Sequence, residues 1–152
     1  MTPDQLVEPA GIKPFEILVV DDSPDDIRLI RDAFSLWKGS RHVQVFLNGA
    51  EVLNHFQNHS QASLPDLILL DWNLPGVNGE QVLEYAKQDK RLRKVPVVIF
   101  TSSSAPADRL RATELGAARF VTKPLDIDEF FNVITGLENL VSGSGPHSGG
   151  PR

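Results

Sequence analysis

Five short runs of apolar and β-branched residues, separated by stretches with helical periodicity, constrain the fold of this chain most strongly. The runs lie at residues 15–20, 43–47, 66–70, 95–100 and 119–122. Their apolar residues follow one another rather than alternate, which is typical of strands buried on both faces of a sheet. Strands separated by helices pair in parallel. The sequence therefore predicts an α/β fold with a doubly wound five-stranded parallel sheet and five flanking helices.

Residues between the runs carry apolar side chains three or four positions apart, which places them on one face of a helix. This periodicity predicts helices over residues 25–37, 50–56, 80–88 and 128–141. Cap residues agree with it, because Ser23, Asn78 and Asp126 stand where a helix N-cap is expected. Gly39 and Gly116 follow predicted helix ends, where glycine can adopt a left-handed conformation.

Composition and charge exclude several classes of function. The 152 residues are 41% hydrophobic, so we expect one hydrophobic core. They include no cysteine, so we expect neither a disulfide nor a thiolate metal site. The formal net charge is -5, and basic residues are scattered apart from a short cluster at 90–94, so we expect no nucleic-acid partner. The chain shows no secretory signal and no run of about 18 apolar residues, so we expect a cytoplasmic protein without membrane association.

The chain is expected to have three segments. Residues 1–14 form an N-terminal extension, and residues 15–141 form one domain. Residues 142–152, SGSGPHSGGPR, form a flexible Gly/Ser-rich tail, because this composition cannot bury apolar surface.

Polar side chains follow four of the predicted strands. Asp21 and Asp22 come after the first, Asp71 after the third, Thr101 after the fourth and Lys123 after the fifth. Considered singly, each residue has an ordinary explanation: the aspartates could cap helices, Thr101 could be a loop residue and Lys123 could be a surface lysine. Open parallel sheets, however, bind ligands beyond the carboxyl ends of their strands, so these groups are expected to converge. Three converging carboxylates repel one another unless a cation joins them, and oxygen ligands favour Mg²⁺.

Four blocks of the sequence, VVDDS, LLDWNLPGVNG, FTSSS and FVTKP, resemble in order the motifs of the receiver domain of two-component response regulators. The resemblance spans about residues 15–141. It implies the flavodoxin-like strand order 2-1-3-4-5. It also implies a single-domain bacterial regulator, similar to chemotaxis regulators and more loosely to small regulators paired with bacterial phytochromes.

The resemblance implies roles for three groups at the predicted site. Asp71 accepts a phosphoryl group from a phosphohistidine of a sensor histidine kinase or a histidine phosphotransfer domain. Lys123 pairs with a phosphoryl oxygen, the bond from Lys123 to Pro124 is cis, and the Thr101 hydroxyl binds the phosphoryl group once attached. Such a chain catalyses its own Mg²⁺-dependent phosphorylation and dephosphorylation without being a conventional turnover enzyme.

The same resemblance implies a Mg²⁺ site. Asp22 is the direct ligand and Asp21 acts through water, while Asp71 and the backbone carbonyl of Asn73 complete the protein's contribution. The cofactor expected is therefore Mg²⁺ alone.

A conformational switch is also implied. Phe120 occupies the position where many members carry a tyrosine. We expect Phe120 to act together with Thr101, turning inward on phosphorylation and burying its ring. This movement would repack the face formed by the fourth helix, fifth strand and fifth helix. The partners expected are the kinase or phosphotransfer protein and a downstream protein target.

Three other readings remain open at this point. A flavin-binding domain would need a phosphate-binding loop after the first strand, where the acidic DDSPDD stands. A haloacid-dehalogenase-like phosphatase would carry its nucleophile after the first strand with a second aspartate two residues on, and VVDDSPD lacks that spacing. A scaffold that signals without phosphorylation, or a phosphoryl sink, keeps the fold and is the main alternative. The kinase, the output and the oligomeric state do not follow from the sequence.

Overall fold

The computed structural model describes residues 13–58 and 63–142, and these residues form one five-stranded sheet flanked by five helices. The elements in chain order are β1 (Phe15–Val20), α2 (Pro24–Phe34), β2 (Arg41–Phe46), α3 (Gly49–Asn58), β3 (Leu67–Leu70), α4 (Gly79–Gln88), β4 (Val97–Thr101), α5 (Pro106–Glu114), β5 (Arg119–Thr122) and α6 (Ile127–Ser142). All neighbouring strands pair in parallel, in the order β2-β1-β3-β4-β5. The predicted fold class and strand order are confirmed.

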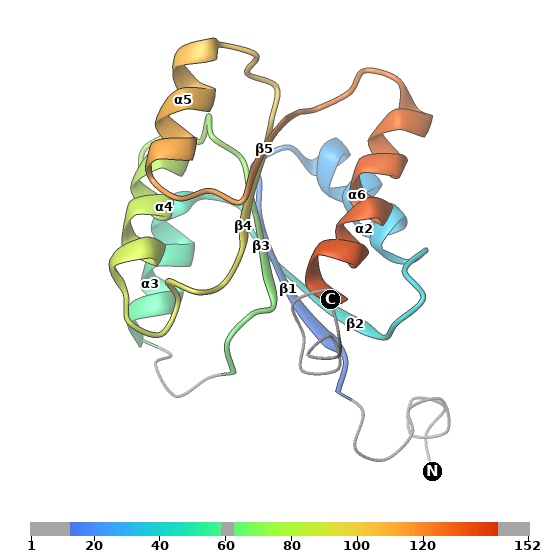
Figure 1. Ribbon diagram of the computed structural model, residues 1–152, viewed down its shortest axis with the longest axis horizontal. Coiled ribbons are helices and arrows are strands. Elements are labelled where there is room, and N and C mark those ends of the chain that lie inside the picture. The colour runs from blue at the N-terminus through green and yellow to red at the C-terminus, as the bar shows by residue number, and fades with distance from the viewer. Residues whose placement is uncertain (1–12, 59–62, 143–152) are drawn as a thin grey trace, which may run out of the picture.

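The helices form two layers, one on each face of the sheet (Figure 1). α2 and α6 cover one face, and α3, α4 and α5 cover the other. Ile68 and Leu70 of β3 belong to the core under α3 and α4, whereas Leu67 and Leu69 belong to the core under α2 and α6. Burial on both faces explains the unbroken apolar run of this central strand.

β2 is less buried than its apolar sequence predicted. His42 and Gln44 are exposed, and Val43 and Val45 are only half-buried. β2 lies at the edge of the sheet and pairs with β1 alone. The prediction that this strand is buried on both faces is wrong, because an apolar run does not show whether a strand is central or at an edge.

The predicted helix caps at Ser23, Asn78 and Asp126 are confirmed. Each side chain accepts a hydrogen bond from the backbone N–H three residues later, at 3.3, 2.9 and 2.9 Å respectively. Gly116 has a φ of +100°, the left-handed conformation expected after a helix. These caps fix where α2, α4 and α6 begin and where α5 ends.

The expectation for Gly39 is wrong. α2 ends at Phe34 with Ser35 as a right-handed C-cap, and Gly39 does not have a positive φ. The side chain of Trp37 explains the early end, because its buried indole N–H donates to the backbone oxygen of Ile134 in α6 at 3.0 Å. The chain leaves the helix so that this ring can pack against α6.

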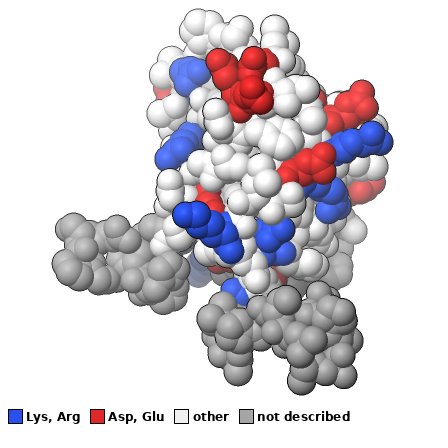
Figure 2. Space-filling view, turned by 90° about the vertical axis from the view of Figure 1, so that its right-hand side faces the viewer, with Lys and Arg blue, Asp and Glu red and all other residues white. Residues whose placement is uncertain are grey.

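Figure 2 shows the face that carries α2 and α6. Basic and acidic side chains lie there among uncharged ones, with no continuous basic patch on the described part of this face. None of the helices within residues 13–58 and 63–142 is long and apolar enough to cross a membrane. The expected extension at 1–14 and tail at 142–152 lie almost wholly outside the described residues.

Candidate functional site

Asp71 lies directly after β3, at the edge of the sheet where the strands' carboxyl ends meet. Its backbone N–H donates to the oxygen of Val20 at the end of β1, at 2.9 Å. The following loop turns back at once, since the N–H of Gly79 donates to the oxygen of Trp72 at 3.0 Å. A Cβ on Gly79 would overlap the carbonyl oxygen of Asp71 and lie 2.6 Å from the Cα of Trp72. A glycine therefore lets α4 start against the strand end that carries Asp71.

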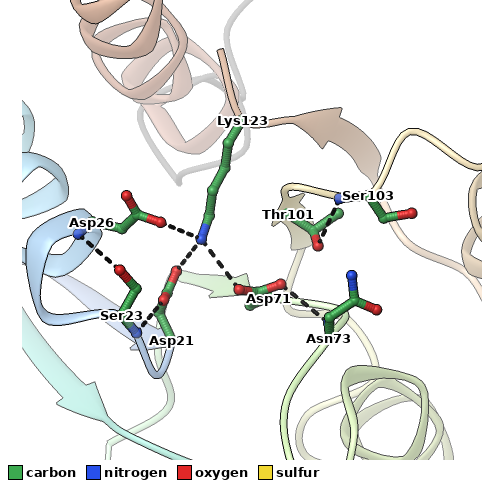
Figure 3. Close-up of polar contacts among 8 residues, drawn as sticks. All are labelled: Asp21, Ser23, Asp26, Asp71, Asn73, Thr101, Ser103 and Lys123. Carbon is green, nitrogen blue, oxygen red and sulfur yellow. Dashed lines mark hydrogen bonds and ion pairs between the residues drawn. The ribbon is translucent and has the colours of Figure 1, made fainter. Parts of the chain in front are cut away.

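Three carboxylates meet at this strand end, as the sequence predicted. Oxygens of Asp21, Asp22 and Asp71 all lie within 4.8 Å of one another. Asp21 and Asp71 are buried, with 1% and 6% of their surface exposed, and Asp22 is exposed. Asp71 Oδ1 accepts a hydrogen bond from the backbone N–H of Asn73 at 3.1 Å (Figure 3). The cluster thus presents one rigid buried carboxylate from each of two strands and one carboxylate that faces water.

Lys123 is the cation of the site. Its Nζ lies 2.8 Å from Asp21, 2.8 Å from Asp26 and 3.2 Å from Asp71 (Figure 3). The side chain of Lys123 is only 8% exposed. The sequence predicted that Lys123 converges with Asp21 and Asp71, but it did not include Asp26 in the site. Asp26 lies in the first turn of α2, and no motif or spacing in the sequence links it to Lys123.

Burial and ion pairing act in opposite directions on the charges of the site. Burial raises the pKa of the Asp21 carboxyl, and the Lys123 ammonium offsets part of this rise. Burial also lowers the pKa of Lys123, but its hydrogen bonds to Asp21 and Asp26 and the charges of Asp21 and Asp71 outweigh burial, so the pKa is raised above its usual value. The ammonium stays charged at neutral pH and contacts three carboxylates, those of Asp21, Asp26 and Asp71, while Asp22 adds a fourth carboxylate to the site.

Thr101 lies at the end of β4, on the side of Asp71 away from Asp26 (Figure 3). Its side chain is fully buried, and its hydroxyl accepts a long hydrogen bond of 3.4 Å from the backbone N–H of Ser103. The Thr101 carbonyl accepts a hydrogen bond from the N–H of Lys123 at 2.6 Å. Thr101 thus links the loop after β4 to the strand end that carries Lys123.

Phe120 is already buried in this structure, with 7% of its surface exposed. Its ring lies edge-on to Trp72 at 6.4 Å between centroids, and the Arg109 guanidinium lies 5.0 Å from the ring centroid. Arg109 also donates to the backbone oxygen of Phe120 at 3.0 Å. The ring is therefore already buried in this structure, whereas the sequence analysis expected it to become buried on phosphorylation.

The peptide bond from Lys123 to Pro124 is trans, because no described peptide bond is cis. The expected cis bond is thus wrong for this structure. The two isomers of an X–Pro bond differ by only about 0.5–1 kcal/mol, so the identity of the residues does not fix the isomer.

The donor set fits a small hard cation. The three carboxylate oxygens lie within 4.8 Å of one another. Two opposite ligands of Mg²⁺ lie about 4.2 Å apart, because each bond is about 2.1 Å long, so the two distances are similar. An open cleft adjoins the cluster, giving the exposed carboxylate of Asp22 access to water and to ions. The cleft is lined by Asp22, Trp72, Asn73, Leu74, Pro75, Asn78, Glu80 and Asp108.

The fold and the site together define a class of protein, and comparison with known families agrees. The sequence model of the response regulator receiver domain matches residues 17–135. The chain therefore belongs to the response regulator receiver domain family, which is phosphorylated on aspartate in two-component signalling.

Individual relatives support this assignment. Response regulator Rre1 of Synechocystis sp. is 32% identical over 125 residues, which cover 82% of this chain and 52% of Rre1. Response regulator Rcp1 of the same organism is 30% identical over 130 residues, which cover 84% of this chain and 88% of Rcp1. The chain thus spans about half the length of Rre1 and most of the length of Rcp1.

Solved structures of relatives have the same fold. The Mn²⁺-bound form of Rcp1 matches with a TM-score of 0.79 at 29% identity, covering 87% of this chain and 97% of Rcp1. The phosphorylated cyanobacterial phytochrome response regulator RcpA matches with a TM-score of 0.81 at 30% identity, covering 88% of this chain and 97% of RcpA.

Proposed function

We propose that this receiver accepts a phosphoryl group on Asp71 from a phosphohistidine of a histidine kinase or phosphotransfer protein. The observation that carries the proposal is the buried Asp71 carboxylate, held at a strand end among two further carboxylates and beside the Lys123 ammonium. A carboxylate oxygen of Asp71 forms a bond to phosphorus, the bond from phosphorus to the histidine nitrogen breaks, and that nitrogen takes up a proton. The product is an aspartyl phosphate.

The other residues would stabilise the charge on the transferring group. Lys123 is positioned to donate to a phosphoryl oxygen, since its Nζ already contacts Asp71 at 3.2 Å. Asp21, Asp22, Asp71 and the carbonyl of Asn73 would hold Mg²⁺. When bound, the ion neutralises charge on the phosphoryl oxygens. The Mn²⁺ bound to Rcp1 and the phosphoryl group on RcpA support both parts of the proposal.

Small-molecule phosphodonors test the proposal without a known kinase. The original protein, incubated with such a donor and Mg²⁺, should gain the mass of one phosphoryl group, and excess chelator should prevent the gain. A protein that gains no mass under any Mg²⁺ concentration would instead be a scaffold that works without phosphorylation.

Metal binding should be visible in thermal stability. Saturating Mg²⁺ should raise the melting temperature of the original protein. An ion at a free concentration of 100 times its Kd stabilises the folded state by about 2.7 kcal/mol, if it binds only that state. Asp22→Asn should lose most of this gain, and it should melt slightly higher than the original protein in chelator, since one repelling charge is removed. Equal melting temperatures of the original protein in chelator and in Mg²⁺ would contradict the metal site.

We further propose that phosphorylation is read through Thr101. Its hydroxyl would leave the weak bond to Ser103 N–H and donate to a phosphoryl oxygen, a stronger charge-assisted bond. Movement of the loop after β4 would then repack the face formed by α5, β5 and α6. Since the Phe120 ring is already inside, the ring would shift within the core rather than enter it from solvent.

Thr101→Ala separates this switch from the phosphorylation step. A stable phosphoryl mimic with Mg²⁺ should shift the amide resonances of residues 105–111 and 119–123 in the original protein. The Thr101→Ala variant should still bind the mimic but lose these distant shifts. If the original protein shows shifts only beside Asp21, Asp22 and Asp71, the chain is a phosphoryl sink or relay.

A further inference from the structure

Asp26 makes a contact with Lys123 that the proposed transfer does not require. The distance from Nζ to Asp26 Oδ2 is 2.8 Å, equal to that to Asp21 and shorter than the 3.2 Å to Asp71. Asp26 belongs to the first turn of α2 rather than to a strand end, and its side chain is 30% exposed. It lies on the side of the ammonium away from Asp71 (Figure 3).

The three contacts occupy the hydrogen-bonding capacity of the ammonium. A lysine ammonium has three N–H donors, and Asp21, Asp26 and Asp71 each lie within hydrogen-bond or ion-pair distance. A phosphoryl oxygen on Asp71 therefore needs a donor that is already engaged. Asp21 is fixed in place, since it is 1% exposed and its Oδ1 accepts the N–H of Ser23 at 2.9 Å. Asp26 is the partner that water can reach and replace.

We propose that Asp26 is a positioning residue that restrains phosphoryl uptake by drawing the Lys123 ammonium toward α2 in the unphosphorylated receiver. The proposal rests on the function proposed above. The ion pair stabilises the starting state and weakens when the ammonium turns to the phosphoryl oxygen. Because a contact that favours one state shifts the population toward it, removing the Asp26 carboxylate favours the phosphorylated state.

The test compares the rates at which variants take up a phosphoryl group from a small-molecule donor at saturating Mg²⁺. Asp26→Asn should be phosphorylated about two- to fivefold faster than the control Asp25→Asn, the range expected for one partly exposed ion pair. Asp25 is the matched control because it lies in the same helical turn, is exposed and carries the same charge. Asp26→Glu, which restores the carboxylate, should return the rate toward that of the original protein.

A second measurement needs no phosphodonor. The melting temperature in chelator is measured for Asp26→Asn in the original protein and in a Lys123→Met background. Asp26→Asn should raise the melting temperature more in the Lys123→Met background. Without the ammonium, the Asp26 carboxylate feels only repulsion from the neighbouring carboxylates. Equal rates for Asp26→Asn and Asp25→Asn, or a slower rate for Asp26→Asn, would overturn the proposal while leaving phosphorylation of Asp71 intact. If the original protein is not phosphorylated at all, the proposed function fails and this inference falls with it.

Discussion

Asp71→Asn should abolish phosphoryl uptake and leave the fold intact. Asparagine nearly matches the shape of aspartate, so the backbone N–H of Asn73 can still donate to its amide oxygen as it does to Asp71 Oδ1. The amide cannot form an acyl phosphate, so the loss should be complete within the detection limit of intact mass. Removing one carboxylate from the cluster should also leave the melting temperature in chelator equal to or above that of the original protein.

Asp25→Asn serves as the control for Asp71→Asn, because it removes one acidic charge from the same end of the molecule without touching the cluster. This control should take up the phosphoryl group. Continued labelling of the Asp71→Asn variant would show that another carboxylate is the acceptor, and loss of labelling in Asp25→Asn would show that overall charge matters more than the site.

Gly79→Ala should give the largest loss of stability, about 3 kcal/mol of unfolding free energy, at the top of the range for forced overpacking. The added Cβ would overlap the carbonyl of Asp71 and lie 2.6 Å from the Cα of Trp72, and neither is the free end of a side chain. Alanine is the better helix former by about 0.5–1 kcal/mol, so the clash outweighs the gain in propensity. Chemical denaturation in chelator measures this loss directly.

Gly136→Ala is the matched control for Gly79→Ala. Gly136 lies inside α6, and apart from the adjoining residues and backbone of its own helix no heavy atom would lie within 4 Å of an added Cβ. This substitution should stabilise the protein by about 0.5–1 kcal/mol, because alanine loses less backbone entropy in a helix. A Gly79→Ala variant as stable as the original protein would contradict the close approach of α4 to Asp71.

The fold class and most of the site could be predicted because both depend on local pattern and on one rule of topology, whereas the strand order followed only from the resemblance to receiver domains. Apolar runs indicated the central strands β3 and β4, whose residues are buried on both faces. Parallel strands bring their carboxyl ends to one edge, so residues that follow different strands must converge there. This rule places Asp21, Asp71 and Lys123 at the same edge of the sheet, whereas the strand order sets which strand ends are neighbours.

The remaining features depend on side-chain reach and on contacts between distant segments. Asp26 joins the site because Lys123, 97 residues away, extends as far as α2, and no spacing in the sequence encodes that distance. Phe120 is buried by Trp72 and Arg109, which come from the loop after β3 and from α5. α2 ends early because Trp37 bonds to α6. Local periodicity contains none of this information.

Chemical mapping of the modified residue tests the central claim most directly. Borohydride reduces the acyl phosphate of an aspartate to the alcohol of homoserine and releases phosphate, so the modified position keeps a permanent change of mass. After labelling with a small-molecule phosphodonor and Mg²⁺, peptide sequencing by mass spectrometry should find homoserine at position 71. Homoserine at position 21, 22 or 26 instead of 71, or no homoserine at position 71 in a protein that carries a phosphoryl group, would contradict the assignment of Asp71 as the phosphoryl acceptor.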